Sequence, residues 1–82
     1  MRATVVVRPK RGILDPQGEA VNNSLRQLGF AVEEARVGRV IDLELRNGDR
    51  ERARAELERM CEQLLANPLI ESYEIELAGV DA

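Results

Sequence analysis

Apolar and polar residues alternate in three parts of the chain, and this alternation predicts β-strands. The first strand is predicted over residues 3–10, which are rich in β-branched residues, and the last over residues 69–79. In a longer stretch over residues 30–48, apolar residues recur at alternate positions. Arg39, directly after Gly38, interrupts this alternation. A glycine at such a break is typical of a bulge or bend, so this stretch is either one bent strand or a hairpin of two strands.

Two segments between these strands have apolar residues three and four positions apart, which predicts helices. The first helix begins after the N-cap residue Asp15, with Pro16 at its first position, and ends at Gly29. The second begins after Asp49, and its charged side has oppositely charged pairs typical of a solvated face. The predicted apolar stripes are Val21, Leu25 and Leu28 in the first helix, and Ala53, Leu57, Met60, Cys61 and Leu64 in the second.

The predicted order is therefore β-α-β(β)-α-β in a single α+β domain over residues 1–82. Two helices are expected on one face of a small, mainly antiparallel sheet of three long or four short strands, ferredoxin-like if the middle stretch is split. With 2% aromatic residues the core must be aliphatic. A core this small is often supplemented by oligomerisation, so we expect a homo-oligomer, at least a dimer.

Composition and charge disfavour several classes of protein. A formal net charge of −3 and the scarcity of aromatic residues argue against nucleic-acid binding, which needs phosphate-neutralising cations and stacking platforms. The sequence has no apolar run long enough to span a bilayer, and its first residues do not resemble a secretory signal. Cys61 is the only cysteine, which suits a reducing compartment. We therefore expect a cytoplasmic protein without membrane or nucleic-acid partners.

The segment RGILDPQGEA could be a glycine-rich anion site at the start of a helix, or only a well-marked helix start. A phosphate cradle would have a Lys or Ser/Thr at the mouth of the helix, whereas this chain has Asp15 and Glu19. The helix start is favoured, and anion binding stays as the alternative. Gly18 costs roughly 0.5–1 kcal/mol in a helix relative to alanine, so it predicts that another backbone comes close.

Residues able to carry chemistry are few. The sequence has no histidine and a single cysteine, so it offers neither a Cys/His nucleophile pair nor a common zinc site. Cys61 falls in the apolar stripe and is expected to be a buried thiol whose pKa the neighbouring Glu62 raises. Acidic pairs at 33–34 and 74–76 could bind a hard cation, but such pairs more commonly line a solvated face. We predict no catalytic, cofactor-binding or metal-binding residue.

Three segments together resemble the PurS family, the small subunit of phosphoribosylformylglycinamidine (FGAM) synthase in de novo purine synthesis. They are LDPQGEAVNNSLRQLGF, ARVGRVIDLEL and MCEQLLANPLIESYEIEL, in this order, and the resemblance extends over essentially the whole chain. Leu69 is a mild variation on the family pattern. The residues that match the family signatures, and that the resemblance marks as a candidate interface, are Asp15, Pro16, Gln17, Gly18, Val37, Gly38, Arg39, Asn67 and Pro68.

This resemblance implies a protein without catalytic activity of its own that works inside an ATP-dependent amidoligase. A PurL-like synthetase subunit would bind ATP, Mg and formylglycinamide ribonucleotide, and a PurQ-like glutaminase subunit would release ammonia from glutamine. The small subunit would bind no cofactor. It would self-associate as a dimer or tetramer, bridge the two larger subunits and support ammonia transfer between them.

Two functions of other classes remain as alternatives. Ferredoxin-like domains often bind metabolites at dimer interfaces, so a small dimeric metabolite-sensing module is the first alternative, supported by fold analogy alone. An enzyme in its own right is the second, and it would need a nucleophile or base that the sequence does not show.

Overall fold

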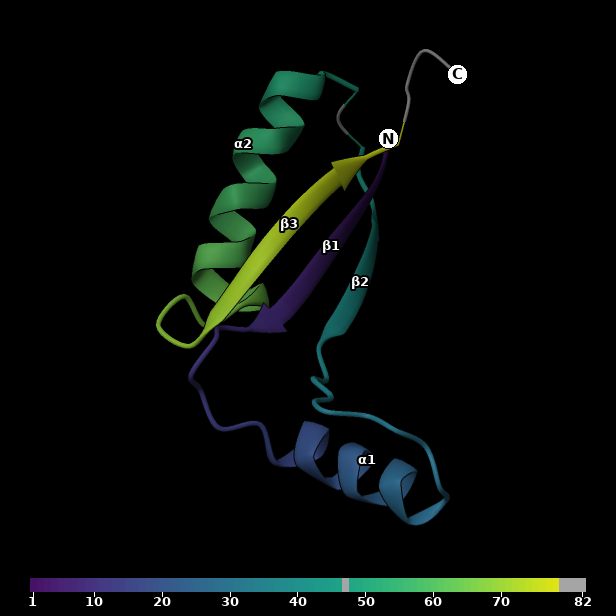
Figure 1. Ribbon diagram of the computed structural model, residues 1–82. Coiled ribbons are helices and arrows are strands. Elements are labelled where there is room, and N and C mark those ends of the chain that lie inside the picture. The colour runs from purple at the N-terminus through teal and green to yellow at the C-terminus, as the bar shows by residue number, and fades with distance from the viewer. Residues whose placement is uncertain (47, 79–82) are drawn as a thin grey trace.

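The computed structural model describes residues 1–46 and 48–78 of the chain (Figure 1). Positions 47 and 79–82, which the predicted ranges include, lie outside the described residues. The predicted α+β class and the order β-α-β-α-β are confirmed. The elements are β1 (Arg2–Pro9), α1 (Pro16–Gln27), β2 (Arg39–Glu44), α2 (Arg50–Met60) with a π-helical turn (Cys61–Leu65), and β3 (Glu71–Leu77).

The three strands form one antiparallel sheet in the order β2-β1-β3. The central strand β1 places Val5 opposite Ile41 of β2 and opposite Ile75 of β3. Because side chains alternate along a strand, these three residues lie on the same face of the sheet. This face packs against α2, so the alternating apolar side chains predicted from the sequence form one layer of the core.

The middle stretch is neither the bent strand nor the hairpin expected from its pattern. Only residues 39–44 pair with β1, and residues 30–38 run alongside α1 without strand pairing (Figure 1). Pairing ends where Val7 faces Arg39, and there the backbone of Gly38 lies close against the backbone of Val7. The apolar parity before Arg39 therefore reflects packing beside a helix and does not mark a strand.

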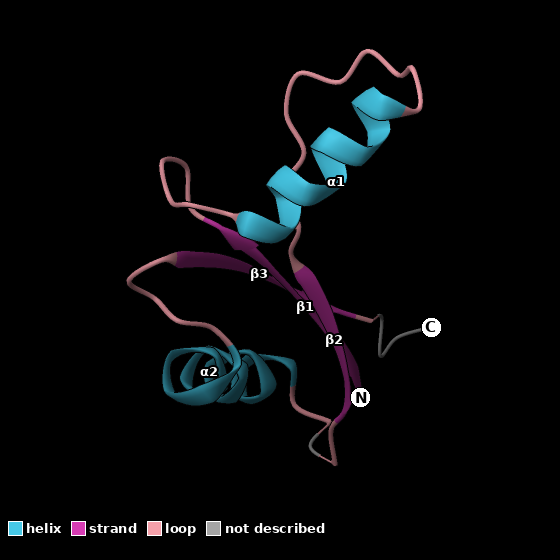
Figure 2. Cartoon of the chain, turned by 90° about the horizontal axis from the view of Figure 1, so that it is seen from below, coloured by secondary structure: helices cyan, strands magenta, loops and turns pink. Residues whose placement is uncertain are grey.

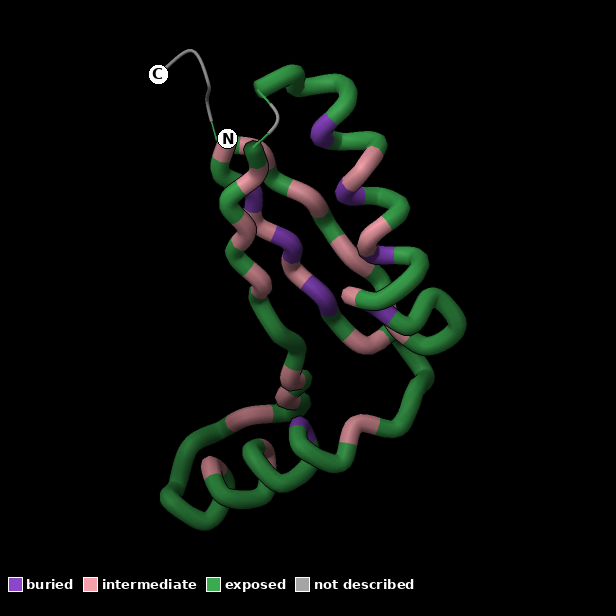
Figure 3. Tube along the Cα trace, turned by 180° about the vertical axis from the view of Figure 1, so that it is seen from behind, coloured by how far each residue is buried: buried purple, intermediate pink, exposed green. Residues whose placement is uncertain are grey.

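The core lies between β1 and α2, and Figure 3 shows buried positions along one side of each. The largest fully buried side chains are Leu57, Val5, Val7 and Cys61. Leu64 was predicted in the apolar stripe but is 82% exposed. The π-helical turn, closed by the Ala66 N–H bonding to the Cys61 carbonyl at 3.0 Å, widens the helix there and turns Leu65 toward the core instead.

Only α2 covers the sheet, so the prediction of two helices on one face is wrong for α1. Figures 1 and 2 show that α1 stands off the end of the sheet, in a projection that we call the arm (residues 10–38). The radius of gyration is 16.1 Å, against about 12 Å for a compact domain of this length. Since β1 and β2 are adjacent antiparallel strands, the arm leaves and re-enters the sheet at the same end.

None of the helices in the described part of the chain is long and apolar enough to span a membrane.

Candidate interaction site at the base of the arm

The base of the arm brings together the sequence segments that carry the family resemblance. A shallow pocket of about 220 Å³ lies there, between the start of α1, the start of β2 and the start of β3. Five of the nine candidate interface residues line it: Asp15, Gln17, Val37, Gly38 and Arg39. Residues far apart in the sequence are thus neighbours, which makes the base of the arm the candidate site.

Asp15 fastens the two ends of the arm to each other. Its Oδ1 accepts the Gly18 N–H at 3.0 Å, which confirms the predicted N-cap. Its Oδ2 accepts the Val37 N–H at 2.9 Å, from the chain that returns to the sheet. The Val37 bond first, and then the Gly18 bond, lowers the pKa of the Asp15 carboxyl below its ordinary value, with a smaller contribution from the charge of Arg36.

The capping bond also bears on the anion-binding alternative. The Gly18 N–H at the mouth of α1 is one that a bound phosphate would use, and the Asp15 carboxylate already occupies it. Pro16, at the first position of the helix, has no N–H to offer. The start of α1 therefore supports the reading of a capped helix.

Gly18 lies where only a glycine fits. A β-carbon at this position would come within 2.4 Å of the Ala35 carbonyl oxygen, so α1 lies directly against the returning chain. The prediction that another backbone approaches Gly18 is confirmed, and that backbone belongs to the same chain. Together with the Asp15 bonds, this contact makes α1 and residues 35–37 one packed unit.

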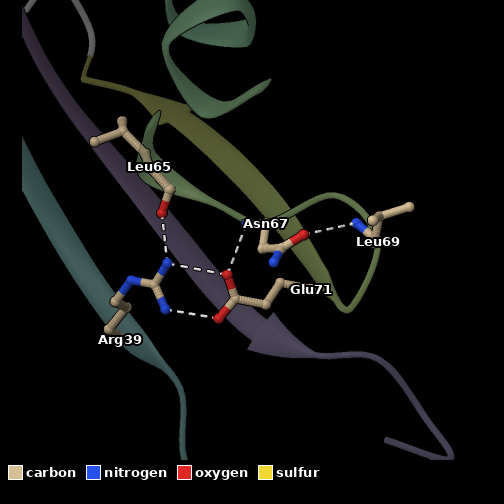
Figure 4. A network of polar contacts seen from close by, with 5 residues as sticks. All are labelled: Arg39, Leu65, Asn67, Leu69 and Glu71. Atoms are coloured by element: carbon tan, nitrogen blue, oxygen red, sulfur yellow. Dashed lines mark hydrogen bonds and ion pairs between the residues drawn. The ribbon is translucent and has the colours of Figure 1, made fainter. Parts of the chain in front are cut away.

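Arg39 connects the second resembling segment to the third (Figure 4). Its guanidinium forms a two-pronged ion pair with Glu71, with Nη1–Oε2 at 2.7 Å and Nη2–Oε1 at 3.0 Å. Nη2 also donates to the Leu65 carbonyl at 2.6 Å, at the end of the π-helical turn. Arg39 therefore joins the start of β2 to the start of β3 and to the end of the π-helical turn.

Glu71 and Asn67 shape the loop before β3. Glu71 Oε1 accepts the Asn67 N–H at 2.8 Å, and Asn67 Oδ1 accepts the Leu69 N–H at 3.1 Å (Figure 4). The pKa of Glu71 is lowered, first by its hydrogen bond from Arg39 and then by the Asn67 N–H, while the Arg39 pKa is raised by the same pair. Pro68 presents its carbonyl to the Lys10 ammonium at 2.7 Å. The Asn67-Pro68 segment is thus tied to the start of the arm.

The other polar groups in the described part of the chain do not assemble into a recognisable catalytic site. Cys61 is fully buried, as predicted, and its thiol pKa is raised by burial first and then by the charges of Glu62 and Glu58. The Tyr73 hydroxyl donates to the Glu62 carboxylate at 3.0 Å, which raises the pKa of Tyr73. Within residues 1–46 and 48–78, His, Cys, Asp and Glu form no group of three or more that could hold a metal ion.

This chain is similar in sequence to known proteins over nearly its whole length. Residues 2–79 match the family model of PurS, described as phosphoribosylformylglycinamidine (FGAM) synthase. The chain belongs to the PurS family. The PurS subunit of FGAM synthase from Methanocaldococcus jannaschii is 37% identical over 81 residues, covering 98% of each chain.

Solved structures of PurS proteins share the fold. Bacillus subtilis PurS superposes with a TM-score of 0.84 at 35% identity, over 95% of this chain and 98% of that one. A chain in the structure of PurLQS from Thermotoga maritima has a TM-score of 0.82 at 33% identity, over 92% and 93% of the two chains. PurS proteins are subunits of FGAM synthase in purine biosynthesis.

The Asp15 bonds predict a specific response to acid. The carboxyl has a lowered pKa in the folded chain, so its stabilisation is present above about pH 4 and is lost as the pH falls through the folded-state pKa. Asp15→Asn should therefore melt at a lower temperature than the unsubstituted protein at pH 6, with the gap closing toward pH 3. Thermal unfolding by circular dichroism between pH 3 and 6 measures this.

Glu19→Gln is the matched control, since Glu19 is an exposed acidic residue in the same first turn of α1. It should leave the pH dependence close to that of the unsubstituted protein. A gap for Asp15→Asn that is equally wide at pH 3 and pH 6 would show that the ionised carboxylate is not what holds the arm.

Proposed function

We propose that this chain is a noncatalytic subunit of a cytoplasmic FGAM synthase. It self-associates, bridges the synthetase and glutaminase subunits, and so supports the transfer of ammonia from one to the other. The observation that carries this proposal is the similarity, over nearly the whole chain, to a protein in the three-component PurLQS structure. The Thermotoga maritima assembly provides a precedent for a fold of this kind working beside larger partners.

The shape of the chain suits a bridging role. A flat body, formed by the sheet and α2, carries a projecting arm, within overall extents of 48 × 29 × 14 Å (Figure 1). Large apolar side chains are exposed along the arm, among them Leu14 at 84% and Phe30 at 58%. Exposed apolar groups that gather in one region mark protein contact surfaces. Arm and body thus offer separate surfaces to different proteins.

The chemistry of the reaction would lie on the other subunits. Ammonia released by a glutaminase diffuses and is protonated in water, so its capture improves when the synthetase is held nearby. ATP and Mg would bind to the large subunit, and this chain would bind no cofactor. Its own polar network at the base of the arm, centred on Asp15, Arg39 and Glu71, would set the direction of the arm.

A metabolite-sensing module is the second candidate, and one observation favours it. A hollow of about 500 Å³ beside the start of β2 includes Arg8, Arg36 and Arg39, which could attract an anionic metabolite. However, Arg8 is paired with Glu74 at 2.8 Å and Arg39 with Glu71 at 2.7 Å. These pairs compete with an anionic ligand. Stabilisation by a nucleotide or amino acid in a thermal-shift measurement of this chain alone would favour the sensor.

The bridging proposal predicts activity that depends on this chain. With synthetase and glutaminase subunits from the same organism, adding it should stimulate glutamine-dependent formation of FGAM and saturate at a fixed stoichiometry. Holding two subunits together raises their effective concentration, so the stimulation should be largest at high dilution. The three proteins should also co-elute in gel filtration.

Ammonium chloride supplied in place of glutamine is the matched control. Free ammonia does not need a neighbouring glutaminase, so the stimulation should shrink or disappear. Glutamine-dependent activity that is equally fast without this chain, at the same dilution, would reject the bridging role and favour the sensor.

A further inference from the structure

The two faces of the sheet are covered differently. α2 packs on the inner face, against Val5 and the side chains that point the same way. Val6 and Val40 lie opposite each other at the next position of the register, so they belong to the other, outer face. Figure 2 shows α2 on one side of the strands and α1 on the other. Within residues 1–46 and 48–78 no helix packs over this outer face, and Val40 is 61% exposed on it.

A hollow of about 500 Å³ lies where the outer face meets the arm. Val6 and Val40, side by side on β1 and β2, form its apolar part together with Pro9 at the end of β1. Arg8 of β1 and Arg36 of the arm also line it. The hollow therefore combines an apolar surface with cationic side chains, at the place where the arm leaves the body.

Arg36 is the arginine of this hollow that has no partner in the described part of the chain. Arg8 is paired with Glu74 at 2.8 Å. Arg39 also lines the hollow, but its guanidinium is paired with Glu71 at 2.7 Å, on the inner face. The side chain of Arg36 is exposed and forms no hydrogen bond or ion pair with any described residue. A carboxylate that enters the hollow can therefore pair with Arg36 without breaking an existing ion pair.

The rest of the outer face is acidic. Thr4 of β1 has Asp42 on one side and Glu76 on the other, and both carboxylates are exposed. Glu44 follows at the far end of β2, next to Arg2. A carboxylate of a partner is therefore attracted at the arm end of the outer face and repelled along the rest of it. This gradient of charge gives the face a direction.

We propose that the hollow docks a segment of one of the larger subunits, in which an apolar side chain packs on Val6 and Val40 and a neighbouring carboxylate pairs with Arg36. The inference rests on the proposed bridging function and assigns one of its contact surfaces. The acidic remainder of the face sets the orientation of the segment, with its carboxylate toward the arm.

The occupant is a segment of another protein because neither a free anion nor a second copy suits this surface as well. A single exposed guanidinium contributes little to binding, so a small anion would be held weakly, whereas a protein segment adds apolar contact beside the ion pair. Two copies with their outer faces together would bring the carboxylates of Asp42 and Glu76 against those of the other copy, and like charges across an interface are unfavourable.

The first test reverses the free charge. Binding of this chain to the synthetase subunit and to the glutaminase subunit of the same organism is measured separately by biolayer interferometry. Arg36→Glu should weaken binding to one of them at least about 10-fold, because it sets a carboxylate against the carboxylate of the partner. Arg11→Glu is the matched control, an exposed arginine of the same arm outside the hollow, and should change binding less than about 2-fold. Higher ionic strength should narrow the difference between the two variants.

The second test removes the apolar contact. Val40→Thr keeps the β-branched shape that suits a strand but adds a hydroxyl, and should weaken the same interaction by about 5-fold. Unchanged subunit binding for Arg36→Glu and Val40→Thr would overturn this docking site while the bridging role stands, and an unsubstituted chain that binds neither subunit would overturn both. Light scattering identifies a second copy as the occupant if Arg36→Glu reduces self-association instead. Displacement of the subunit by inorganic phosphate at constant ionic strength would show a site for free anions and contradict the proposal.

Discussion

Leu57→Ala is expected to lower the free energy of unfolding by about 2–5 kcal/mol, the range for removing a leucine from a core. Leu57 is 0% exposed and packs in the same cluster as Val5, Val7 and Cys61. That cluster contains few side chains, so they can fill little of the cavity that the substitution leaves. Urea unfolding followed by circular dichroism at 25 °C measures the change, with the protein concentration held fixed because self-association shifts apparent stability.

Arg54→Ala is the matched control on the same helix. Arg54 is exposed, and its replacement should change the free energy of unfolding by less than about 0.5 kcal/mol. The two substitutions alter helix propensity only slightly, so their difference reports burial. Equal unfolding midpoints for the two variants would show that the buried side of α2 has been misassigned.

The strands and α2 could be predicted because burial alone sets their patterns. Alternate residues of β1 face α2, and Ala53 and Leu57 recur at helical spacing on the side that faces the sheet. Leu64 was misplaced because spacing assumes a regular helix, and the π-helical turn that begins at Cys61 rotates everything after it. No residue in this turn signals its wider geometry.

The position of α1 could not be predicted from the same kind of pattern. An apolar stripe shows that part of a helix is to be covered, but it carries no information on which surface covers it. Val21 and Leu28 were assigned to a core within the chain, and they lie exposed on the arm. The alternating apolar residues before Arg39 gave a wrong prediction for the same reason. They were assigned to a strand, and they lie beside α1 without strand pairing.

The candidate site was predictable in part. Asp15 as a cap follows from local chain geometry, but its second bond, to Val37, depends on a fold-back of 22 residues. Glu71 was missed because a glutamate at the start of an alternating strand is typical of a solvated position. The signal that could have found it is Arg39, a cation that interrupts an apolar parity and whose planar guanidinium pairs well with a carboxylate.

Gly38→Ala is expected to destabilise the chain by about 1–3 kcal/mol, the cost of overpacking a tight contact. A β-carbon at Gly38 would lie 2.2 Å from the Val7 carbonyl oxygen and 3.2 Å from the Val7 carbonyl carbon. These are backbone atoms of the central strand, which is paired on both sides and cannot move away. The start of β2 would have to shift instead, which strains the ion pair between Arg39 and Glu71 at 2.7 Å.

Gly48→Ala is the control for the general effect of adding a methyl group to a glycine. No atom of the described structure lies within 4 Å of a β-carbon there, so an added methyl group meets open space. The substitution should therefore cost less than Gly38→Ala, because it creates no overpacked contact. Urea unfolding of both variants decides the matter. A Gly38→Ala protein as stable as the Gly48→Ala protein would mean that the arm is not pressed against β1 at this point.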